Sequence, residues 1–216
     1  MDANSDVQMV ETIARTYSEA FTPEYFVLLC TIAVLVYEVR SARDPELRDF
    51  GPRVGVVALG WAVAFAIYEG APSLFGTVPS WGPDFTGSLG LGVGITLIWG
   101  VWRVQQWGRR VPEFSLLLVA ATVPHLLVTP FWDVSSHVLY AAVPAGYLAF
   151  LDRRFAPALV VALGMVVARP LAGAHTWPES IGGLVLAGLV LAGFAYRNDR
   201  TREGRTRGTA TDAERL

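Results

Sequence analysis

The sequence predicts an all-α, polytopic membrane helix bundle, and three observations lead to this prediction. Of the 216 residues, 53% are hydrophobic and 17% are charged, whereas soluble domains carry about 25% charged residues. Apolar stretches close to the length that crosses a bilayer, about 20 residues, recur between charged or Pro/Gly-rich breaks. If the chain crosses the membrane about seven times, 15 of the 17 basic residues fall on the same side of the membrane, in or next to the connections between spans or in the C-terminal segment.

The seven stretches follow one another with short connections. A polar, acidic segment, residues 1–23, precedes the first stretch and has no basic region, which excludes a cleavable signal peptide. Glycines at 87, 90, 92 and 94 favour close packing of the third stretch against another helix. The predicted spans are residues 24–39, 52–69, 85–104, 113–130, 135–151, 155–171 and 178–196.

Arginine placement supports this count and orients it. The sequence has no lysine, and only Arg15 and Arg169 fall on the arginine-poor side. Cytoplasmic loops are enriched in basic residues, so we expect a multi-pass protein of the cell membrane with its N-terminus outside and its C-terminus in the cytoplasm. The arginine-rich segments are residues 40–53, 103–110, 152–154 and 197–216.

Composition also excludes several classes of function. The net charge of −2 excludes a nucleic-acid binder held by bulk basicity. A single cysteine, Cys30, excludes an internal disulfide framework and a cysteine-rich metal site. The absence of lysine excludes a Schiff-base or Walker lysine. Without internal repeats, and with few charges inside the stretches, the sequence gives little support to a transporter.

Ionisable and hydroxyl side chains gather at two joints of the second half, residues 131–134 and 172–177, which the topology places at the same outer membrane face. His125, five residues before Pro130, lies about 7–8 Å below that face at 1.5 Å per residue. Ionisable groups at membrane depth are expensive to bury and are functional candidates. The side chains expected to converge are Ser135, Ser136, His137, Arg169, His175 and Glu179.

The order and spacing of these residues carry a family resemblance. Arg169 is followed after five residues by His175 and after three more by Glu179. Upstream, residues 134–137 read Val-Ser-Ser-His at the start of the preceding hairpin. Both patterns resemble motifs of the type 2 phosphatidic acid phosphatase family, which are Ser-Arg-x5-His-x3-Asp and Pro-Ser-Gly-His. Residues 113–196 resemble the four-helix core of that family.

The first motif of the family, Lys-x6-Arg-Pro, is degenerate here. Thr122, Thr129 and Pro130 keep its spacing and its proline, but both cationic side chains are absent. Hydropathy, arginine placement and the resemblance together divide the chain into an extracytoplasmic segment (1–23), three N-terminal helices with their loops (24–112), a phosphatase-like core (113–196) and a disordered cytoplasmic tail (197–216).

The resemblance implies a lipid-phosphate or polyprenyl-diphosphate phosphatase that needs no cofactor and no metal. It implies that His175 attacks phosphorus and carries a phosphohistidine. Glu179 replaces the aspartate that orients the imidazole, and His137 protonates the leaving alkoxide and later activates water. The expected partners are membrane lipids and the phosphorylated lipid substrate.

The same resemblance assigns groups to the phosphate oxygens. Arg169 suits bidentate contact with phosphate, and backbone N–H groups at Ser135, Ser136 and His137 add donors at a helix N-terminus. A protonated His125 supplies part of the missing first-motif charge. Because two cations are absent, a catalytically weak or inactive relative that binds a lipid or a partner protein is the alternative.

Simpler roles compete with each of these assignments. Thr176 to Glu179 forms a capping-box sequence, and Ser135 and Ser136 suit N-caps. His125 suits a helix–helix hydrogen bond, and Arg169 suits an interfacial arginine. A third function, a metal-dependent hydrolase, would use His125, His137, His175 and Glu179, although no closely spaced ligand pair supports it.

Overall fold

A computed structural model describes residues 3–41, 50–74 and 79–213, and helices dominate these residues. Arg43 and Arg48 of the arginine-rich loop 40–53 lie outside the described residues. The described elements are α1 (Ala3–Ala20), α2 (Pro23–Arg40), α3 (Phe50–Leu74), α4 (Gly82–Gln105), α5 (Arg110–Val128), α6 (Ser136–Leu151), the short 3₁₀ helix η2 (Arg153–Phe155), α7 (Ala158–Leu171) and α8 (Trp177–Ala213).

Helices α2 to α8 each coincide with one of the seven apolar stretches. Five segments, in α3, α4, α5, η2–α7 and α8, are long and apolar enough to cross a membrane. A sixth span arises if α1 and α2, which meet at a bend of 46°, count as one. Helix α6 is apolar but has only 16 residues. The architecture therefore fits a multi-pass membrane protein with five or six such spans in the described residues, rather than the seven expected.

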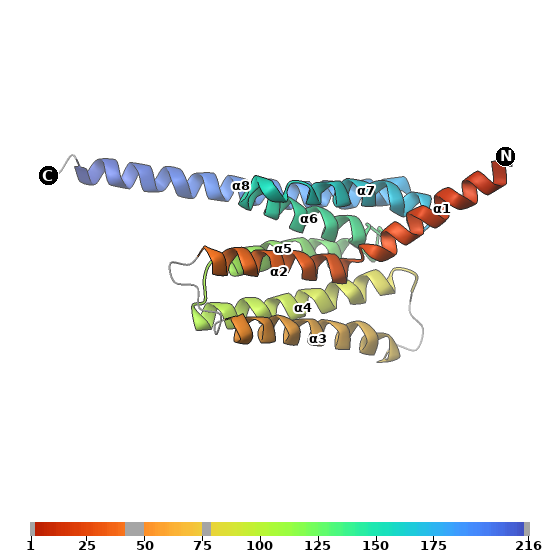
Figure 1. Cartoon of the computed structure of the whole chain (residues 1–216), viewed down its shortest axis with the longest axis horizontal. Helices are drawn as coiled ribbons and strands as arrows, with labels where there is room; N and C mark the ends of the chain where they lie inside the picture. The colour runs from red at the N-terminus through yellow and green to blue at the C-terminus, as the bar shows by residue number, and fades with distance from the viewer. Residues whose placement is uncertain (1–2, 42–49, 75–78, 214–216) are drawn as a thin grey trace.

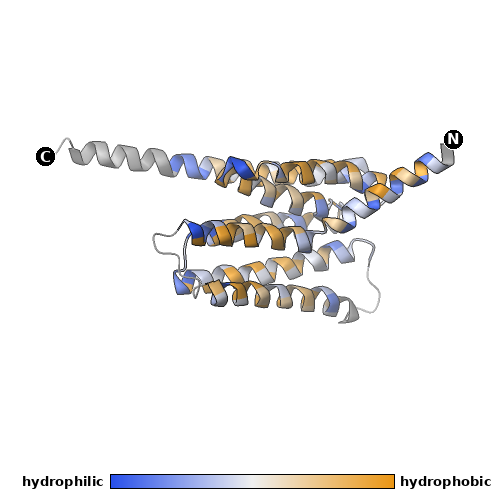
Figure 2. Cartoon of the chain, in the orientation of Figure 1, coloured by the Kyte–Doolittle hydropathy of each residue, from blue (hydrophilic) through white to orange (hydrophobic). Residues whose placement is uncertain are grey.

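The helices lie roughly parallel in three layers (Figure 1). Helices α6, α7 and α8 form one layer, α2 and α5 lie in the middle, and α3 and α4 form the third. Figure 2 shows hydrophobic residues along the middle of the bundle and hydrophilic residues toward its ends. Helix α6 contacts α2, α5, α7 and α8 and is buried along most of its length, so its first turn has a fixed position in the bundle.

Glycines bring α3 and α4 into backbone contact, as the glycine pattern of the third stretch predicts. A Cβ atom at Gly90 would lie 2.5 Å from the carbonyl oxygen of Ala64, and one at Gly94 would collide with the carbonyl oxygen of Gly60. Small residues let membrane helices approach this closely. This contact fixes the position of α4, whose first turn contributes to the site described below.

A buried carboxylate joins the helices at the end of the bundle where α2 and α4 end and α5 begins. Glu38 in α2 accepts hydrogen bonds from the Trp102 indole N–H (3.0 Å) and from the backbone N–H of Arg110 (2.5 Å). The Tyr147 hydroxyl donates to the carbonyl oxygen of Arg110 at 3.0 Å. These bonds satisfy an otherwise unpaired N–H group at the start of α5 and connect α2, α4, α5 and α6.

Two regions differ from the sequence expectation. Residues 3–20, expected only as a polar segment, form α1, and its Tyr17 hydroxyl donates to the carbonyl oxygen of Val161 at 3.0 Å. The structure continues α8 through residues 197–213, where a disordered tail was expected. This stretch contains no proline and several residues of high helix propensity, such as arginine, glutamate and alanine, so nothing in its sequence ends the helix at residue 196.

Candidate functional site

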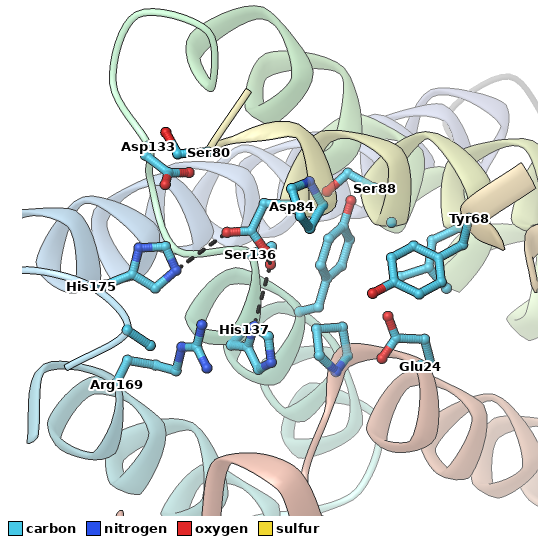
Figure 3. Close-up of a pocket in the computed structure, with 16 residues that line it drawn as sticks. Glu24, Tyr68, Ser80, Asp84, Ser88, Asp133, Ser136, His137, Arg169 and His175 are labelled. Atoms are coloured by element: carbon cyan, nitrogen blue, oxygen red, sulfur yellow. Dashed lines mark hydrogen bonds and ion pairs between the residues drawn. The ribbon is translucent and has the colours of Figure 1, made fainter. Parts of the chain in front are cut away.

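A polar cavity of about 250 Å³ lies at the end of the bundle where α2, α4, α6 and α8 begin and where α5 and α7 end (Figure 3). Side chains from both halves of the chain surround it. The polar and charged residues that line it are Glu24, Tyr68, Ser80, Asp84, Ser88, Asp133, Ser136, His137, Tyr140, Arg169 and His175.

The structure brings four of the sequence-predicted site residues to this cavity. Ser136 and His137 come from the first turn of α6, Arg169 from the last turn of α7, and His175 from the loop before α8. Figure 3 shows the Arg169 guanidinium directed toward His137 and close to His175. The joints at residues 131–134 and 172–177 therefore meet at one end of the bundle, where the backbone N–H of Ser135 donates to the carbonyl oxygen of Glu179 at 3.2 Å.

Glu179 has two contacts that use the same carboxylate oxygen. Its Oε2 accepts a hydrogen bond from the backbone N–H of Thr176 at 2.7 Å, which is the capping-box bond at the start of α8. The same oxygen lies 3.4 Å from Nδ1 of His175. The capping role and the imidazole-orienting role are therefore compatible, because a carboxylate oxygen can accept more than one donor.

Ser135 and His125 lie outside the cavity lining. The Ser135 side chain accepts from the backbone N–H of Val138 at 3.5 Å and caps α6. His125 is fully buried, with Nε2 2.9 Å from the carbonyl oxygen of Val134 and Nδ1 3.0 Å from the hydroxyl of Ser88. Because a carbonyl only accepts, this network assigns the proton to Nε2. His125 thus holds the 131–134 joint against α4 and α5.

The degenerate first-motif positions also form contacts within the bundle. Thr122 Oγ1 lies 2.9 Å from the Tyr140 hydroxyl, and Thr129 Oγ1 donates to the carbonyl oxygen of His125 at 2.7 Å. Neither threonine is among the residues that line the cavity. The two cations missing from the sequence are therefore not replaced at these positions.

Asp84, in the first turn of α4, is the central residue that the sequence analysis missed. Its Oδ1 accepts a hydrogen bond from the Ser136 hydroxyl at 2.5 Å, and its Oδ2 lies 3.2 Å from Nε2 of His175 (Figure 3). Gly82-Pro83-Asp84 reads only as an ordinary helix start with an acidic first turn. Glu24 and Tyr68 also come from the N-terminal half, so residues 113–196 alone do not complete the site.

Negative charge predominates among the residues around the cavity. Three carboxylates, from Glu24, Asp84 and Asp133, face a single guanidinium, that of Arg169. Burial raises the pKa of Asp133 above its ordinary value, and the nearby charge of Asp84 raises it further. Among the described residues, Oδ1 of Asp133 is buried without a hydrogen-bond partner. The site therefore has an unbalanced carboxylate beside its buried imidazole.

Comparison with known proteins identifies no family for this chain. No protein-family model, no curated protein and no solved structure matches it.

Proposed function

We propose that the chain is an integral membrane hydrolase that removes phosphate from a lipid phosphate or a polyprenyl diphosphate. The observation that carries this proposal is the meeting of His137, Arg169 and His175 at one cavity, although they come from three separate segments. Two imidazoles and a guanidinium are the groups that attack on phosphorus, proton transfer and stabilisation of phosphoryl oxygens require.

His175 is the proposed nucleophile. Glu179 lies 3.4 Å from its Nδ1 and Asp84 lies 3.2 Å from its Nε2. Once the substrate phosphate displaces Asp84, the Glu179 contact favours the tautomer whose Nε2 has a free lone pair. A bond then forms between Nε2 and phosphorus while the bond from phosphorus to the lipid oxygen breaks. This step requires His137 in its protonated form, which gives one proton to the leaving oxygen and becomes neutral. In the second step His137 takes a proton from water, whose oxygen attacks phosphorus and releases His175 and inorganic phosphate.

Arg169 is the proposed phosphate-binding residue. Its side chain provides the one guanidinium among the described residues that line the cavity. Charge develops on the phosphoryl oxygens during transfer, and the planar guanidinium can donate two parallel hydrogen bonds to them. Loss of one preorganised donor of this kind typically costs a factor of 10²–10³ in kcat.

The position of the cavity suits a lipid headgroup. It lies at the end of the helices, where hydrophilic residues replace the hydrophobic middle of the bundle (Figure 2). We place this end at the outer face of the cell membrane, because the arginine-rich connections lie at the other end. The N-terminus is then outside and the C-terminus is cytoplasmic.

A second candidate function is lipid-phosphate binding without catalysis. The observation that favours it is Asp84, whose Oδ2 lies 3.2 Å from Nε2 of His175 and stands where phosphorus would approach. A substrate phosphate would have to displace this carboxylate. The missing first-motif cations would make such displacement less favourable.

Release of inorganic phosphate from a panel of lipid phosphates and polyprenyl diphosphates tests the proposal. The purified chain should release phosphate, and His175→Ala and Arg169→Gln should each lower the rate at least 100-fold. Glu113→Gln is the control, because Glu113 lies at the opposite end of the bundle and forms ion pairs there with Arg109 and Arg110. Equal rates in wild type and His175→Ala would refute the mechanism. Lipid-phosphate binding without release would favour the second candidate.

A further inference from the structure

The charges that surround the cavity favour a bound cation, because three carboxylates face one guanidinium among the described residues that line it. Asp84 and Asp133 lie together at the His175 side of the cavity, whereas Glu24 lies beside Tyr68 on the opposite side (Figure 3). Two neighbouring carboxylates repel each other unless a proton or a cation lies between them. Arg169 alone balances one of these charges.

We propose that Asp84, Asp133 and His175 bind a divalent transition-metal cation such as Zn²⁺ or Mn²⁺. One potential ligand atom from each residue lies within 4.8 Å of the other two. In a tetrahedral site with bonds of about 2.1 Å the ligand atoms are about 3.4 Å apart, so small side-chain rotations complete the geometry. Two carboxylates and an imidazole are typical ligands of these metals.

The imidazole of His175 is an independent indication of a ligand. Its side chain is only 2% exposed, and neither ring nitrogen has a partner in hydrogen-bond geometry among the described residues. The carboxylates of Asp84 and Glu179 lie within ion-pair distance of it, but they do not meet hydrogen-bond geometry. A metal ion at Nε2 would provide the missing partner.

The surroundings of the three ligands also match those of known metal sites. A metal-bound histidine usually directs its other ring nitrogen to a carboxylate, and Glu179 lies 3.4 Å from Nδ1 of His175. A ligating carboxylate is usually held by a further hydrogen bond, and Asp84 Oδ1 accepts one from Ser136 at 2.5 Å. The Asp84 contact is a hydrogen bond, and the Glu179 carboxylate lies beside the second ring nitrogen of His175.

Cation binding has a chemical consequence for the proposed function, but the binding itself does not depend on that function. Nε2 of His175 has one lone pair, which can bond either a metal ion or phosphorus. A bound cation therefore competes with phosphohistidine formation. The proposal departs from the expectation of a metal-free site, and its ligands differ from the histidine set considered from the sequence.

Binding of Zn²⁺ and Mn²⁺ to the full chain in detergent tests the proposal directly. The protein should carry no polyhistidine tag and should first be stripped with a chelator; calorimetry and elemental analysis then give the stoichiometry and the dissociation constant. We expect one cation per chain. Asp84→Asn and Asp133→Asn should each weaken binding at least 10-fold, and His175→Gln should do the same.

Glu24→Gln is the matched control, because it removes a carboxylate from the same cavity without removing a ligand. It should change the dissociation constant by at most about 3-fold. Circular dichroism and gel filtration verify that each variant is folded, and Asn is nearly isosteric with Asp. The proposal is overturned if the folded wild type binds no cation, or if Asp84→Asn and Asp133→Asn bind it as tightly as the wild type does.

A phosphate-release assay separates this proposal from the proposed function. If both are correct, the bound cation lowers the rate and a chelator restores it. If the protein binds no cation, the rate of phosphate release in the presence of chelator still tests the phosphohistidine mechanism. If release requires the cation, the metal site stands and the phosphohistidine mechanism fails.

Discussion

At the scale of single residues, the imidazole of His175 lies between two carboxylates. Glu179 lies beside Nδ1, and Asp84 lies beside Nε2. In this account Glu179 orients the imidazole ring through Nδ1. The group that lies beside Nε2 then determines the chemistry of the site. A metal ion there would be shared with Asp84, whereas a phosphorus atom would have to displace the Asp84 carboxylate.

Asp133 gives a prediction about stability. Its pKa is raised above its ordinary value of 3.8, first by burial and then by the charge of Asp84, so ionisation destabilises the folded state at pH values above that raised pKa. Asp133→Asn removes this cost. In the presence of chelator, we expect the variant to unfold at a higher temperature than the wild type at pH 7.

The pH dependence of this difference has a definite sign. The cost is complete above the raised pKa and disappears as the pH falls through that value toward 3.8. The advantage of Asp133→Asn should therefore shrink on acidification. Asp199→Asn on the exposed part of α8 is the control, and a lower unfolding temperature for Asp133→Asn at pH 7 would contradict the account.

Part of the candidate site was predictable from the sequence, because the order of the helices alone brings several of its residues to the same end of the bundle. His137 and Arg169 each lie about three residues from an outward joint, and His175 lies within one, so helix counting places all three at one end of the bundle. Asp84 was not found, because its proximity to His175 depends on how α4 packs against the C-terminal helices. His125 was expected to supply charge to the phosphate site but lies outside the cavity lining. Hydropathy predicts the depth of a side chain in the membrane but not the direction in which it points.

At the scale of elements, the contact between α3 and α4 determines where the first turn of α4 lies. Gly94→Val should separate these helices, because a Cβ atom there would collide with the carbonyl oxygen of Gly60. Overpacking of this kind costs about 1–3 kcal/mol. We expect a lower unfolding temperature in detergent and weaker cation binding, since Asp84 lies on the same helix.

Gly100→Val is the matched control for this prediction. It introduces the same side chain into the same helix, at a position where nothing lies within 4 Å of the added Cβ atom. The intrinsic helix propensity therefore changes equally in the two variants. Equal unfolding temperatures for the two variants would show that the glycine contact does not hold the helices together.

Helices were predictable where hydropathy is decisive. The seven apolar stretches coincide with α2 to α8, and five segments of the described residues are also long enough to cross a bilayer, whose thickness sets the length and apolarity of a span. Helix α1 and the continuation of α8 past residue 196 are polar, so a search for apolar stretches cannot detect them. Their helical form depends on propensity and packing instead.

At the scale of the whole molecule, the asymmetric arginine distribution predicts the orientation. Phe131 is 91% exposed in the joint at residues 131–134, and Arg154 is exposed in η2 at the opposite end. The wild type is a suitable background, because its only cysteine, Cys30, is buried. In intact cells, a membrane-impermeant thiol reagent should label Phe131→Cys but not Arg154→Cys.

Permeabilised cells provide the control, since both cysteines should then react. Labelling of Arg154→Cys alone in intact cells would reverse the orientation and place the cavity at the cytoplasmic face. Labelling of both in intact cells would show that the two ends are not separated by a membrane. The concentration of arginine residues at one end of the bundle would then need another explanation.

The central claim is that Nε2 of His175 forms a bond to phosphorus. Rapid quenching of the chelator-treated protein with a lipid phosphate, followed by mass spectrometry under alkaline conditions, detects a phosphohistidine, which is labile to acid. The account predicts one phosphate on His175, none in His175→Ala, and a slower loss of the phosphate in His137→Gln. Phosphate release that continues with no phosphohistidine at His175 would contradict it.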